Sequence, residues 1–468
     1  MAHVRSLPPL FLLVALTATS SAWAAAPEVV AVFPAVEATD ICRDAPLSVT
    51  FSTAPVLNPA GSVKIYERGS LELVDTIEFR TPTDYKTIGG IPGFAYHRFL
   101  VNGNTIELFP KPEALARSNW FSAVLDRGDG TPPEKLWEFR LKDGPARGTP
   151  QLTVAADGTG DFCTVQGALD FLPAGNKQPV TIFVREGTYR EIVAFSDKDE
   201  ITLRGEDRAG TVITCANNNN FNPAINPYRR GLILAHHTRD FTITNLTLRN
   251  TTPPGGSQAE ALILDGTSDA HAIVKDVDLY SSQDTLQING QAYVSGCHIE
   301  GDVDFVWGTG PCFLTNCTLV ALRSNAYYTQ IRNPAGNHGY VFKGCRFDGP
   351  AGVTGNFLSR IEPGRFPASA VVLLDCVLGP AVGAVAWRFD APAARGAAVA
   401  PPPDTSRIHF WESNSHTADG QPVDVSRRLA ASRQLRQPDD AAVIASYSSP
   451  VWVLGGEWNP VMAGMIHD

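Results

Sequence analysis

The chain has 468 residues, too many for one ordinary globular core, so we expect two or three domains or an elongated repeat architecture. Hydrophobic residues make up 44% of the chain, and 40 Gly with 35 Pro suit a turn-rich β protein better than a helical bundle. The formal net charge of −10 argues against a nucleic-acid partner, because a negative protein repels a phosphate backbone.

Residues 1–24 are predicted to be a secretory signal peptide. Arg5 gives a short positive start, an apolar run extends from Leu10 to Leu16, and residues 22–24 (AWA) form a small-x-small cleavage pattern. A membrane anchor is the weaker alternative, because the run is shorter than the ~20 residues that span a bilayer. We therefore expect a secreted protein, extracellular or periplasmic, with no membrane partner.

Residues 27–145 carry short alternating strands such as LSVTFS, SVKIYE and TIELF, separated by Pro, Gly and Asn turns. This pattern predicts a small immunoglobulin-like β-sandwich, with residues 142–148 (KDGPARG) as a linker to the next domain. No residue of the region marks a site, so a spacer or stabilising role is favoured over carbohydrate binding.

Residues 150–468 contain an imperfect repeat. Segments such as FTITNLTL, AIVKDVDL and AYVSGCHI place an Asn, Asp or Gly between apolar residues. The residues that follow this position are Leu246, Val277, Cys297, Cys317, Cys345 and Cys376, at intervals of 31, 20, 20, 28 and 31 residues. One turn of chain per repeat predicts a parallel β-helix, right-handed as parallel crossovers are. The expected fold class is therefore all-β, with a right-handed parallel β-helix preceded by a small immunoglobulin-like β-sandwich.

Residues 217–220 (NNNN) are expected to form a flexible insertion loop.

Two acidic segments lie within this repeat, SQDTLQI with Asp284 and GDVDFVWG with Asp304. Their separation, 304 − 284 = 20 residues, equals a neighbouring repeat interval, so the two carboxyl groups should stack on adjacent coils about 4.8 Å apart. Two carboxylates that close cannot both ionise comfortably, so one pKa should rise and the other fall, giving a proton donor and a nucleophile. Spacing alone leaves open that both acids only cap backbone groups in turns.

Seven motifs in a fixed order carry a family resemblance: DGTGDFCTVQGAL (157–169), EGTYREIV (186–193), QAEAL (258–262), QDTL (283–286), GDVDFVWG (301–308), TQIR (329–332) and FLSR (357–360). This succession resembles the pectin methylesterase (pectinesterase) family from about Thr153 to the C-terminus. EGTYREIV alone is a weak signal, whereas QDTL followed one coil later by VDFxxG is a strong one.

The resemblance implies a role for each matching residue. Asp304 corresponds to the nucleophile that attacks a methyl-ester carbonyl, and Asp284 to the acid/base that protonates methanol and then activates water. Gln258 and Gln283, from the family's QAVAL-like and QDTL motifs, correspond to the oxyanion donors. Arg360 corresponds to the arginine that pairs with the nucleophile. The resemblance implies no metal or organic cofactor. It implies a monomer whose partner is pectin (methylated homogalacturonan).

The chain departs from the family after Arg360, where LGRPW becomes LSRIE (358–362). This change removes a tryptophan of the sugar-binding surface and adds Glu362, which would repel a galacturonate carboxylate. Phe305, Trp307 and Trp387 are predicted as replacement stacking surfaces, although aromatic residues of a β-helix also serve in packing.

Three other functions stay open. An ester hydrolase of the same family with a drifted substrate fits the altered segment. A pectate lyase or polygalacturonase would share the fold but needs a calcium-binding or three-acid motif that the sequence lacks. A non-catalytic carbohydrate-binding protein would release no methanol from pectin, which separates it from the esterases.

Eight cysteines in an exported chain permit disulfides, and without any CxxC pair they do not predict zinc. Cys297 and Cys317 fall on the ladder position of adjacent coils, which should bring their α-carbons to about 5 Å, so we predict a bridge between them. Cys345 and Cys376 could pair in the same way. The alternative is that stacked cysteines are small apolar core residues.

Overall fold

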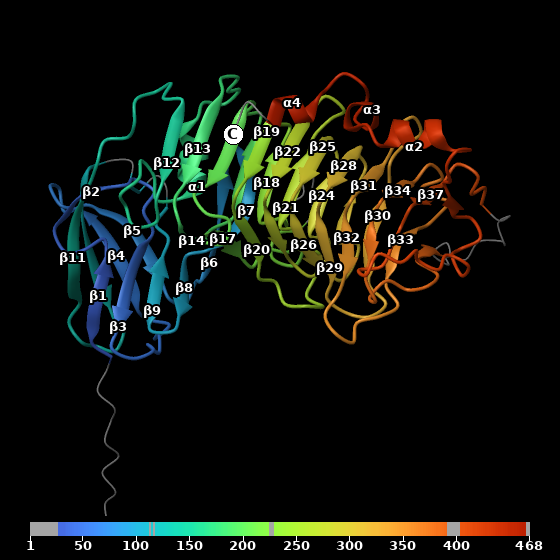
Figure 1. The fold of residues 1–468 in the computed structure, drawn as a ribbon. Coiled ribbons are helices and arrows are strands. Elements are labelled where there is room, and N and C mark those ends of the chain that lie inside the picture. Colours follow the sequence, from blue (N-terminus) through green and yellow to red (C-terminus); the bar gives the residue numbers. More distant parts are fainter. Residues whose placement is uncertain (1–26, 112–113, 116–117, 224–228, 391–402, 465–468) are drawn as a thin grey trace, which may run out of the picture.

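The computed structural model describes residues 27–464 apart from 112–113, 116–117, 224–228 and 391–402. Its regular secondary structure is almost entirely β-strand, in a smaller N-terminal region and a long C-terminal one that lie side by side (Figure 1). The predicted signal peptide, residues 1–24, lies outside the described residues. None of the described helices is long and apolar enough to cross a bilayer.

The N-terminal region consists of two sheets that share one hydrophobic core. One sheet has the order β1-β3-β9-β8 and the other β2-β11-β10-β4-β5, antiparallel except for the pair β2 and β11. Phe51, Phe121 and Trp137 meet in the core between them. This arrangement is a sandwich at the predicted place, while its immunoglobulin-like type and its boundaries at 27 and 145 stay predictions. The strands are β1 (Val29–Phe33), β2 (Ala38–Ile41), β3 (Leu47–Phe51), β4 (Ser62–Glu67), β5 (Leu73–Glu78), β8 (Phe99–Asn102), β9 (Thr105–Leu108), β10 (Trp120–Asp126) and β11 (Glu134–Leu141).

A hairpin leaves the N-terminal region and packs on the C-terminal one. Its strands, β6 (Thr83–Ile88) and β7 (Ile91–His97), form a two-stranded sheet of their own. Ile88 and Phe94 of the hairpin join a separate cluster with Ala194 and Ile263 of the C-terminal region. The hairpin therefore ties the two regions together through buried apolar surface.

The C-terminal region is a parallel β-helix of three sheets, as predicted, and we assign it the right hand of parallel crossovers. The first sheet contains β12 (Gln151–Val154), β13 (Val180–Val184), β16 (Ile201–Gly205), β19 (Phe241–Thr244), β22 (His271–Lys275), β25 (Gln291–Ser295), β28 (Cys312–Thr315), β31 (Tyr340–Lys343), β34 (Ala370–Leu374), β37 (His409–Ser413) and β38 (Arg433–Gln434). The second contains β14 (Gly187–Arg190), β17 (Thr211–Cys215), β20 (Thr247–Asn250), β23 (Asp278–Tyr280), β26 (His298–Gly301), β29 (Thr318–Ala321), β32 (Arg346–Asp348) and β35 (Val377–Leu378). The third, called here the site sheet, contains β15 (Val193–Ser196), β18 (Ile233–His236), β21 (Leu262–Asp265), β24 (Leu286–Ile288), β27 (Val306–Gly308), β30 (Tyr327–Ile331), β33 (Phe357–Ile361) and β36 (Trp387–Phe389).

The repeat found in the sequence marks the bend between the first and second sheets. Each Asn, Asp or Gly of the repeat has a positive φ, for example 57° at Asn245, 54° at Asp276 and 64° at Gly296. Asn, Asp and Gly tolerate this left-handed conformation better than other residues, so the chain turns there at little cost. The next residue, such as Leu246 or Val277, is fully buried in the core.

The predicted bridge between Cys297 and Cys317 is wrong, and so is the possible pairing of Cys345 with Cys376, because all eight cysteines have free thiols. Equivalent residues on adjacent coils point the same way, so their β-carbons do not converge as a disulfide requires, even with neighbouring α-carbons. Each thiol instead donates to its own strand end: Cys297 Sγ lies 3.3 Å from the Ser295 carbonyl oxygen and Cys317 Sγ 3.4 Å from that of Thr315. These cysteines are small core residues.

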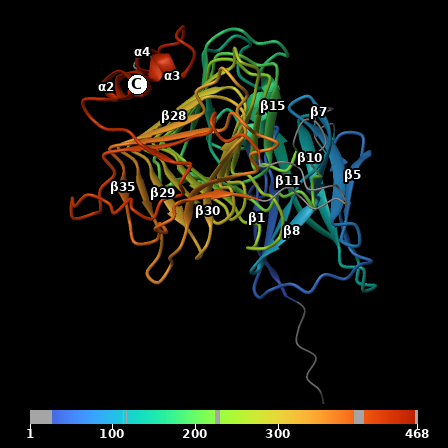
Figure 2. The ribbon, with the colours of Figure 1, turned by 90° about the vertical axis from the view of Figure 1, so that its right-hand side faces the viewer.

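Within the described residues, four short helices lie outside the strands: α1 (Val165–Phe171), α2 (Ala441–Tyr447), α3 (Pro450–Val453) and α4 (Pro460–Gly464). The C-terminal helices lie on a different side of the β-helix from the sandwich (Figure 2). Tyr447 and Val453 pack there on Phe313, Val341 and Val372 of the first sheet. The site sheet is left uncovered by these helices.

Candidate active site

The two predicted acids stack at the beginning of adjacent strands of the site sheet. Asp284 precedes β24 and Asp304 precedes β27 by the same number of residues, and the register pairs Leu286 with Val306. The Asp284 backbone N–H donates to the Val303 carbonyl at 3.0 Å, so the two turns are themselves hydrogen-bonded. Both aspartates have positive φ, 65° and 48°, the left-handed conformation that Asn and Asp also adopt at the bends of the β-helix.

Arg360 holds the carboxylate of Asp304 with two parallel hydrogen bonds. Its Nε lies 2.8 Å from Oδ1 and its Nη2 lies 2.6 Å from Oδ2. The guanidinium is held in turn by Asp390, at 3.4 Å, and lies 4.3 Å from the ring centre of Tyr327. The predicted contact between Arg360 and Asp304 is therefore present, in the two-pronged geometry that fixes a carboxylate most firmly.

The two acids differ in how strongly their pKa values are displaced. Burial raises the pKa of Asp304, and the adjacent Arg360 guanidinium opposes that rise. Burial raises the pKa of Asp284 well above its usual range, and a second carboxylate, Glu260, adds to the effect. The expectation that one pKa falls was wrong, because both groups are more than nine-tenths inaccessible and lose hydration. The pKa of Asp284 is nevertheless the more strongly raised of the two, so Asp284 is the stronger candidate for the protonated acid.

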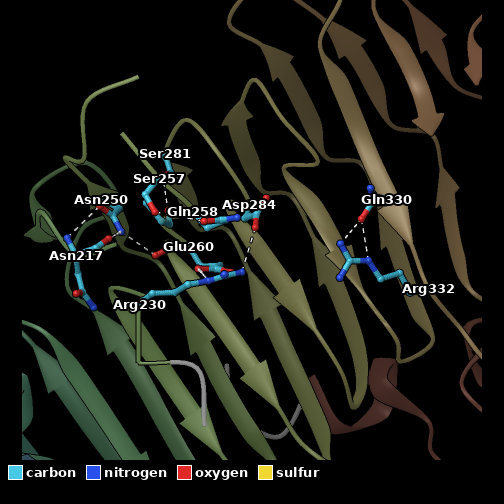
Figure 3. Close-up of polar contacts among 11 residues, drawn as sticks. Asn217, Arg230, Asn250, Ser257, Gln258, Glu260, Ser281, Asp284, Gln330 and Arg332 are labelled. Carbon is cyan, nitrogen blue, oxygen red and sulfur yellow. Dashed lines mark hydrogen bonds and ion pairs between the residues drawn. The ribbon is translucent and has the colours of Figure 1, made fainter. Parts of the chain in front are cut away.

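A third acid and a second arginine belong to the same column, and the sequence analysis did not assign either of them. Glu260 precedes β21 and stacks one coil before Asp284, as the pairing of Leu262 with Leu286 requires. Arg230 precedes β18, one coil further, and reaches both carboxyl groups (Figure 3). The sequence signal for Glu260 lies in QAEAL, 24 residues before Asp284, a separation close to the length of one coil.

Gln258 and Gln283 lie beside the acids on neighbouring coils. The Ala259 N–H donates to the Gln283 carbonyl at 3.2 Å, and Gln283 forms a parallel bridge with Val303. Both glutamines are half-buried, and Figure 3 shows the Gln258 side chain extending toward Asp284. The structure thus brings both predicted donors to the acids, while their oxyanion role stays a prediction.

Two of the three predicted sugar-stacking residues were wrong. Phe305 and Trp387 have no exposed surface, because each points into the core of the β-helix. Phe305 packs on Tyr328, with ring centres 5.3 Å apart, and the Trp387 indole donates to Glu412 at 3.0 Å. A ring enclosed in this way cannot stack on a sugar.

Trp307 remains a prediction as a sugar contact, because 5% of its surface is exposed at the site sheet. The guanidinium carbons of Arg332 and Arg230 lie 4.7 and 5.7 Å from the centre of its ring system.

The two residues after Arg360, where the sequence departs from the family, lie in different surroundings. Ile361 is buried, whereas Glu362 is partly exposed and lies 3.7 Å from Arg365. That partner offsets part of the repulsion expected of Glu362.

The asparagine segment 217–220 lies in a loop, as expected, but its first residue is held in place by hydrogen bonds. Asn217 is fully buried, and its amide nitrogen donates to the carbonyl oxygens of Arg229 at 2.9 Å and Gly231 at 2.6 Å. Asn250 donates in turn to the Asn217 carbonyl at 2.6 Å. Asn217 is therefore part of the support behind the site.

Among the described residues, one group has three possible metal-ligand atoms within 4.8 Å of one another: Cys42, Asp44 and Cys163. It lies where the sandwich meets the β-helix and does not include the stacked acids. The Asp44 carboxylate already accepts hydrogen bonds from the Cys163 and Thr164 backbone N–H groups, so its position is explained without an ion.

These features define a class, the parallel β-helix proteins with stacked carboxyl groups at the edge of one sheet. Within it, the chain belongs to the pectinesterase family, whose model matches residues 151–387. "Probable pectinesterase/pectinesterase inhibitor 23" of Arabidopsis thaliana is 30% identical over 264 residues, which cover 53% of this chain and 45% of the relative. "Pectinesterase 31" of the same plant is 31% identical over 214 residues, or 43% of this chain and 66% of the relative. The chain thus spans less than two thirds of the length of these curated relatives.

Solved structures share the fold. The pectin methylesterase from carrot superposes with a TM-score of 0.56 at 21% identity, over 68% of this chain and 97% of that one. PemA from Erwinia chrysanthemi gives 0.53 at 23% identity, over 68% and 99%. A pectin methylesterase solved in complex with a hexasaccharide gives 0.54 at 24% identity, over 66% and 98%.

Proposed function

We propose that this protein hydrolyses the methyl esters of galacturonate in pectin and releases methanol. The observation that carries the proposal is the contrast between two stacked carboxyl groups: Asp304 is held by Arg360 in two hydrogen bonds, while burial and Glu260 favour the protonated form of Asp284. A nucleophile and a proton donor of the same chemical type need such a contrast. Family membership and the hexasaccharide bound to a neighbour of the same fold support pectin as the substrate.

The first half of the reaction forms an acyl-enzyme. A carboxylate oxygen of Asp304 attacks the ester carbonyl carbon, and the carbonyl electron pair moves to its oxygen. The amide N–H groups of Gln258 and Gln283 donate to this oxyanion. When the carbonyl re-forms, the bond to the methoxy oxygen breaks, and Asp284 gives its proton to that oxygen, so methanol leaves and an anhydride with Asp304 remains.

The second half consumes one water molecule. Asp284, now ionised, takes a proton from water while the water oxygen attacks the galacturonyl carbon of the anhydride. The bond to Asp304 breaks and returns its electron pair to the carboxylate. The product is a galacturonate carboxyl group, and Asp284 is protonated again for the next cycle.

The test is methanol release from methylated pectin, measured beside hydrolysis of simple acyl esters and with a strong chelator present throughout. We expect wild-type protein to release methanol, and Asp304→Asn to retain less than about a thousandth of that rate because it lacks the nucleophile. A folded Asp304→Asn variant with more activity would remove Asp304 from this role. Loss of wild-type activity that added calcium restores would contradict a cofactor-free mechanism.

The segment after Arg360 favours one second candidate, an esterase of the same mechanism with another acyl ester as substrate. Glu362 stands where the family's motif has tryptophan, and it retains some exposed surface. Faster hydrolysis of simple esters than of pectin would favour this candidate.

A further inference from the structure

Arg230 is hydrogen-bonded to two carboxyl groups at once (Figure 3). Its Nε lies 2.9 and 3.0 Å from the two carboxylate oxygens of Glu260, and its Nη2 lies 2.7 Å from Oε1. The same Nη2 lies 3.1 Å from Oδ2 of Asp284. Glu260 has no exposed surface and Arg230 only 6%. One buried guanidinium therefore joins the carboxyl group of Glu260 to that of the candidate acid/base.

Two asparagines hold the backbone on which this pair stands. The Asn217 amide donates to the carbonyl groups on both sides of Arg230, at Arg229 and Gly231. The Asn250 amide donates to the Glu260 carbonyl at 3.0 Å as well as to Asn217. The backbone at both charged residues is thus held by hydrogen bonds from uncharged amide side chains.

Stability alone does not explain charge at these positions. Buried ion pairs cost so much hydration that well-packed apolar residues often serve stability equally well. The third contact, to Asp284, points to a role at the site.

We propose that Arg230 and Glu260 act as a positioning pair for Asp284. Arg230 fixes the direction of the Asp284 carboxyl through Oδ2, and Glu260 cancels the positive charge of Arg230 so that Asp284 can still be protonated. An arginine alone would orient Asp284 but also favour its ionised form, and an ionised carboxylate cannot donate a proton to methanol. This role rests on the proposed function.

The charged groups around Asp284 come from several coils. Glu260 and Asp304 lie on the coils before and after it, and both raise its pKa. Arg230, before β18, and Arg332, one residue after β30, lower it. Loss of Glu260 removes one of the two negative neighbours and leaves both arginines, so the pKa of Asp284 must fall.

The experiment is the pH dependence of kcat/KM for methanol release by wild type and Glu260→Gln. Asp284 has to be protonated for the first half-reaction, so its pKa sets the alkaline limb of the profile. We expect Glu260→Gln to move this limb to lower pH by about one unit or more, the size of effect that one adjacent charge has. The double variant Glu260→Gln/Arg230→Gln should return the limb toward its wild-type position and keep a lowered kcat, because both charges and the orienting contact are gone.

A matched control exists elsewhere in the β-helix. Glu412 on β37 is also fully buried and accepts two hydrogen bonds from Arg428, at 2.8 and 3.1 Å, yet neither residue contacts Asp284. Glu412→Gln should lower the melting temperature and leave the alkaline limb in place. An equal shift in both variants, or no shift in Glu260→Gln, would overturn the positioning role.

A second readout separates this proposal from the proposed function. Infrared difference spectra between each protein and its Asp284→Asn counterpart follow the protonated Asp284 carboxyl without any substrate. We expect the titration midpoint to fall in Glu260→Gln and to stay in Glu412→Gln. An unmoved midpoint overturns the electrostatic role of Glu260 whether or not the protein hydrolyses pectin. A lowered midpoint in a protein that releases no methanol would contradict the proposed function alone.

Discussion

At the residue scale, the site is a column of three acids with an arginine at each end. Glu260, Asp284 and Asp304 occupy equivalent positions on successive coils, Arg230 binds the first two, and Arg360 binds the last. Stacked carboxylates repel one another, and burial strengthens that repulsion. Each arginine opposes the rise in pKa that burial causes in the outer carboxyl group it binds, while burial and Glu260 raise the pKa of the central one, Asp284, well above its usual range.

The glutamines beside this column provide a test of oxyanion stabilisation. Gln258→Ala and Gln283→Ala should each lower kcat for methanol release by roughly 10²-fold, because each removes one donor to a charge that develops only in the transition state. Steady-state rates on methylated pectin would measure the effect. Gln291→Ala is the control, since Gln291 lies on the first sheet and its amide binds the Ser268 carbonyl. Near-normal rates in both site variants would mean that other groups hold the oxyanion.

At the scale of elements, the hairpin β6–β7 lies against β15 at a contact that only glycine allows. Gly89, in the turn of the hairpin, has φ of 54°, and a β-carbon there would lie 1.8 Å from the Ala194 carbonyl oxygen. The Gly89 carbonyl also accepts a hydrogen bond from the Ser196 N–H at 3.2 Å. The hairpin is thus docked by its backbone as well as by Ile88 and Phe94.

Gly89→Ala should therefore destabilise the protein by about 2–5 kcal/mol, the sum of a left-handed alanine and an overpacked contact. The neighbouring Gly90 is a matched control, because it also has positive φ, 85°, but has no atom within 4 Å of an added β-carbon. Gly90→Ala should cost only about 1–2 kcal/mol. Chemical denaturation of both variants measures the difference, and equal losses would show that the hairpin is not docked through Gly89.

At the scale of the whole molecule, the N-terminal region reaches the support of the site. Asn222 exchanges two hydrogen bonds with the backbone of Ala95 on β7, at 2.7 and 3.1 Å, and donates to the Asn217 side chain at 2.8 Å. Asn217 in turn holds the backbone around Arg230. A continuous set of buried hydrogen bonds therefore runs from the hairpin to the positioning pair.

A second junction forms where the sandwich meets the start of α1. The Asp44 carboxylate accepts the Thr164 N–H at 2.7 Å and the Thr164 hydroxyl at 2.6 Å, and Thr164 caps α1 by accepting from Gly167 N–H at 2.9 Å. Asp44→Ala leaves these donors without a partner, which should cost about 1–3 kcal/mol and weaken the coupling of the two regions.

We expect calorimetry of Asp44→Ala to show the sandwich and the β-helix unfolding in separate transitions. The two unfolding temperatures should lie further apart in this variant than in wild type. Asp129→Ala is the control, because Asp129 makes comparable bonds to Thr131 in an exposed turn that contacts no other region. An unchanged melting profile for Asp44→Ala would show that other contacts hold the junction.

The sequence determined the parts of this protein that depend on local chemistry and spacing. Asn, Asp and Gly at the bends, with apolar residues after them, determine a β-helix because few residues accept a left-handed turn. Equal spacing placed Asp284 and Asp304 on adjacent coils, and the ordered motifs led to Arg360. Tertiary structure decided what depends on direction and burial: which aromatic rings face inward, why stacked thiols do not bond, and why both acids lose hydration. It also decided that Arg230, 54 residues before Asp284, lies against it, because only the folded coils bring a side chain across that separation to 3.1 Å.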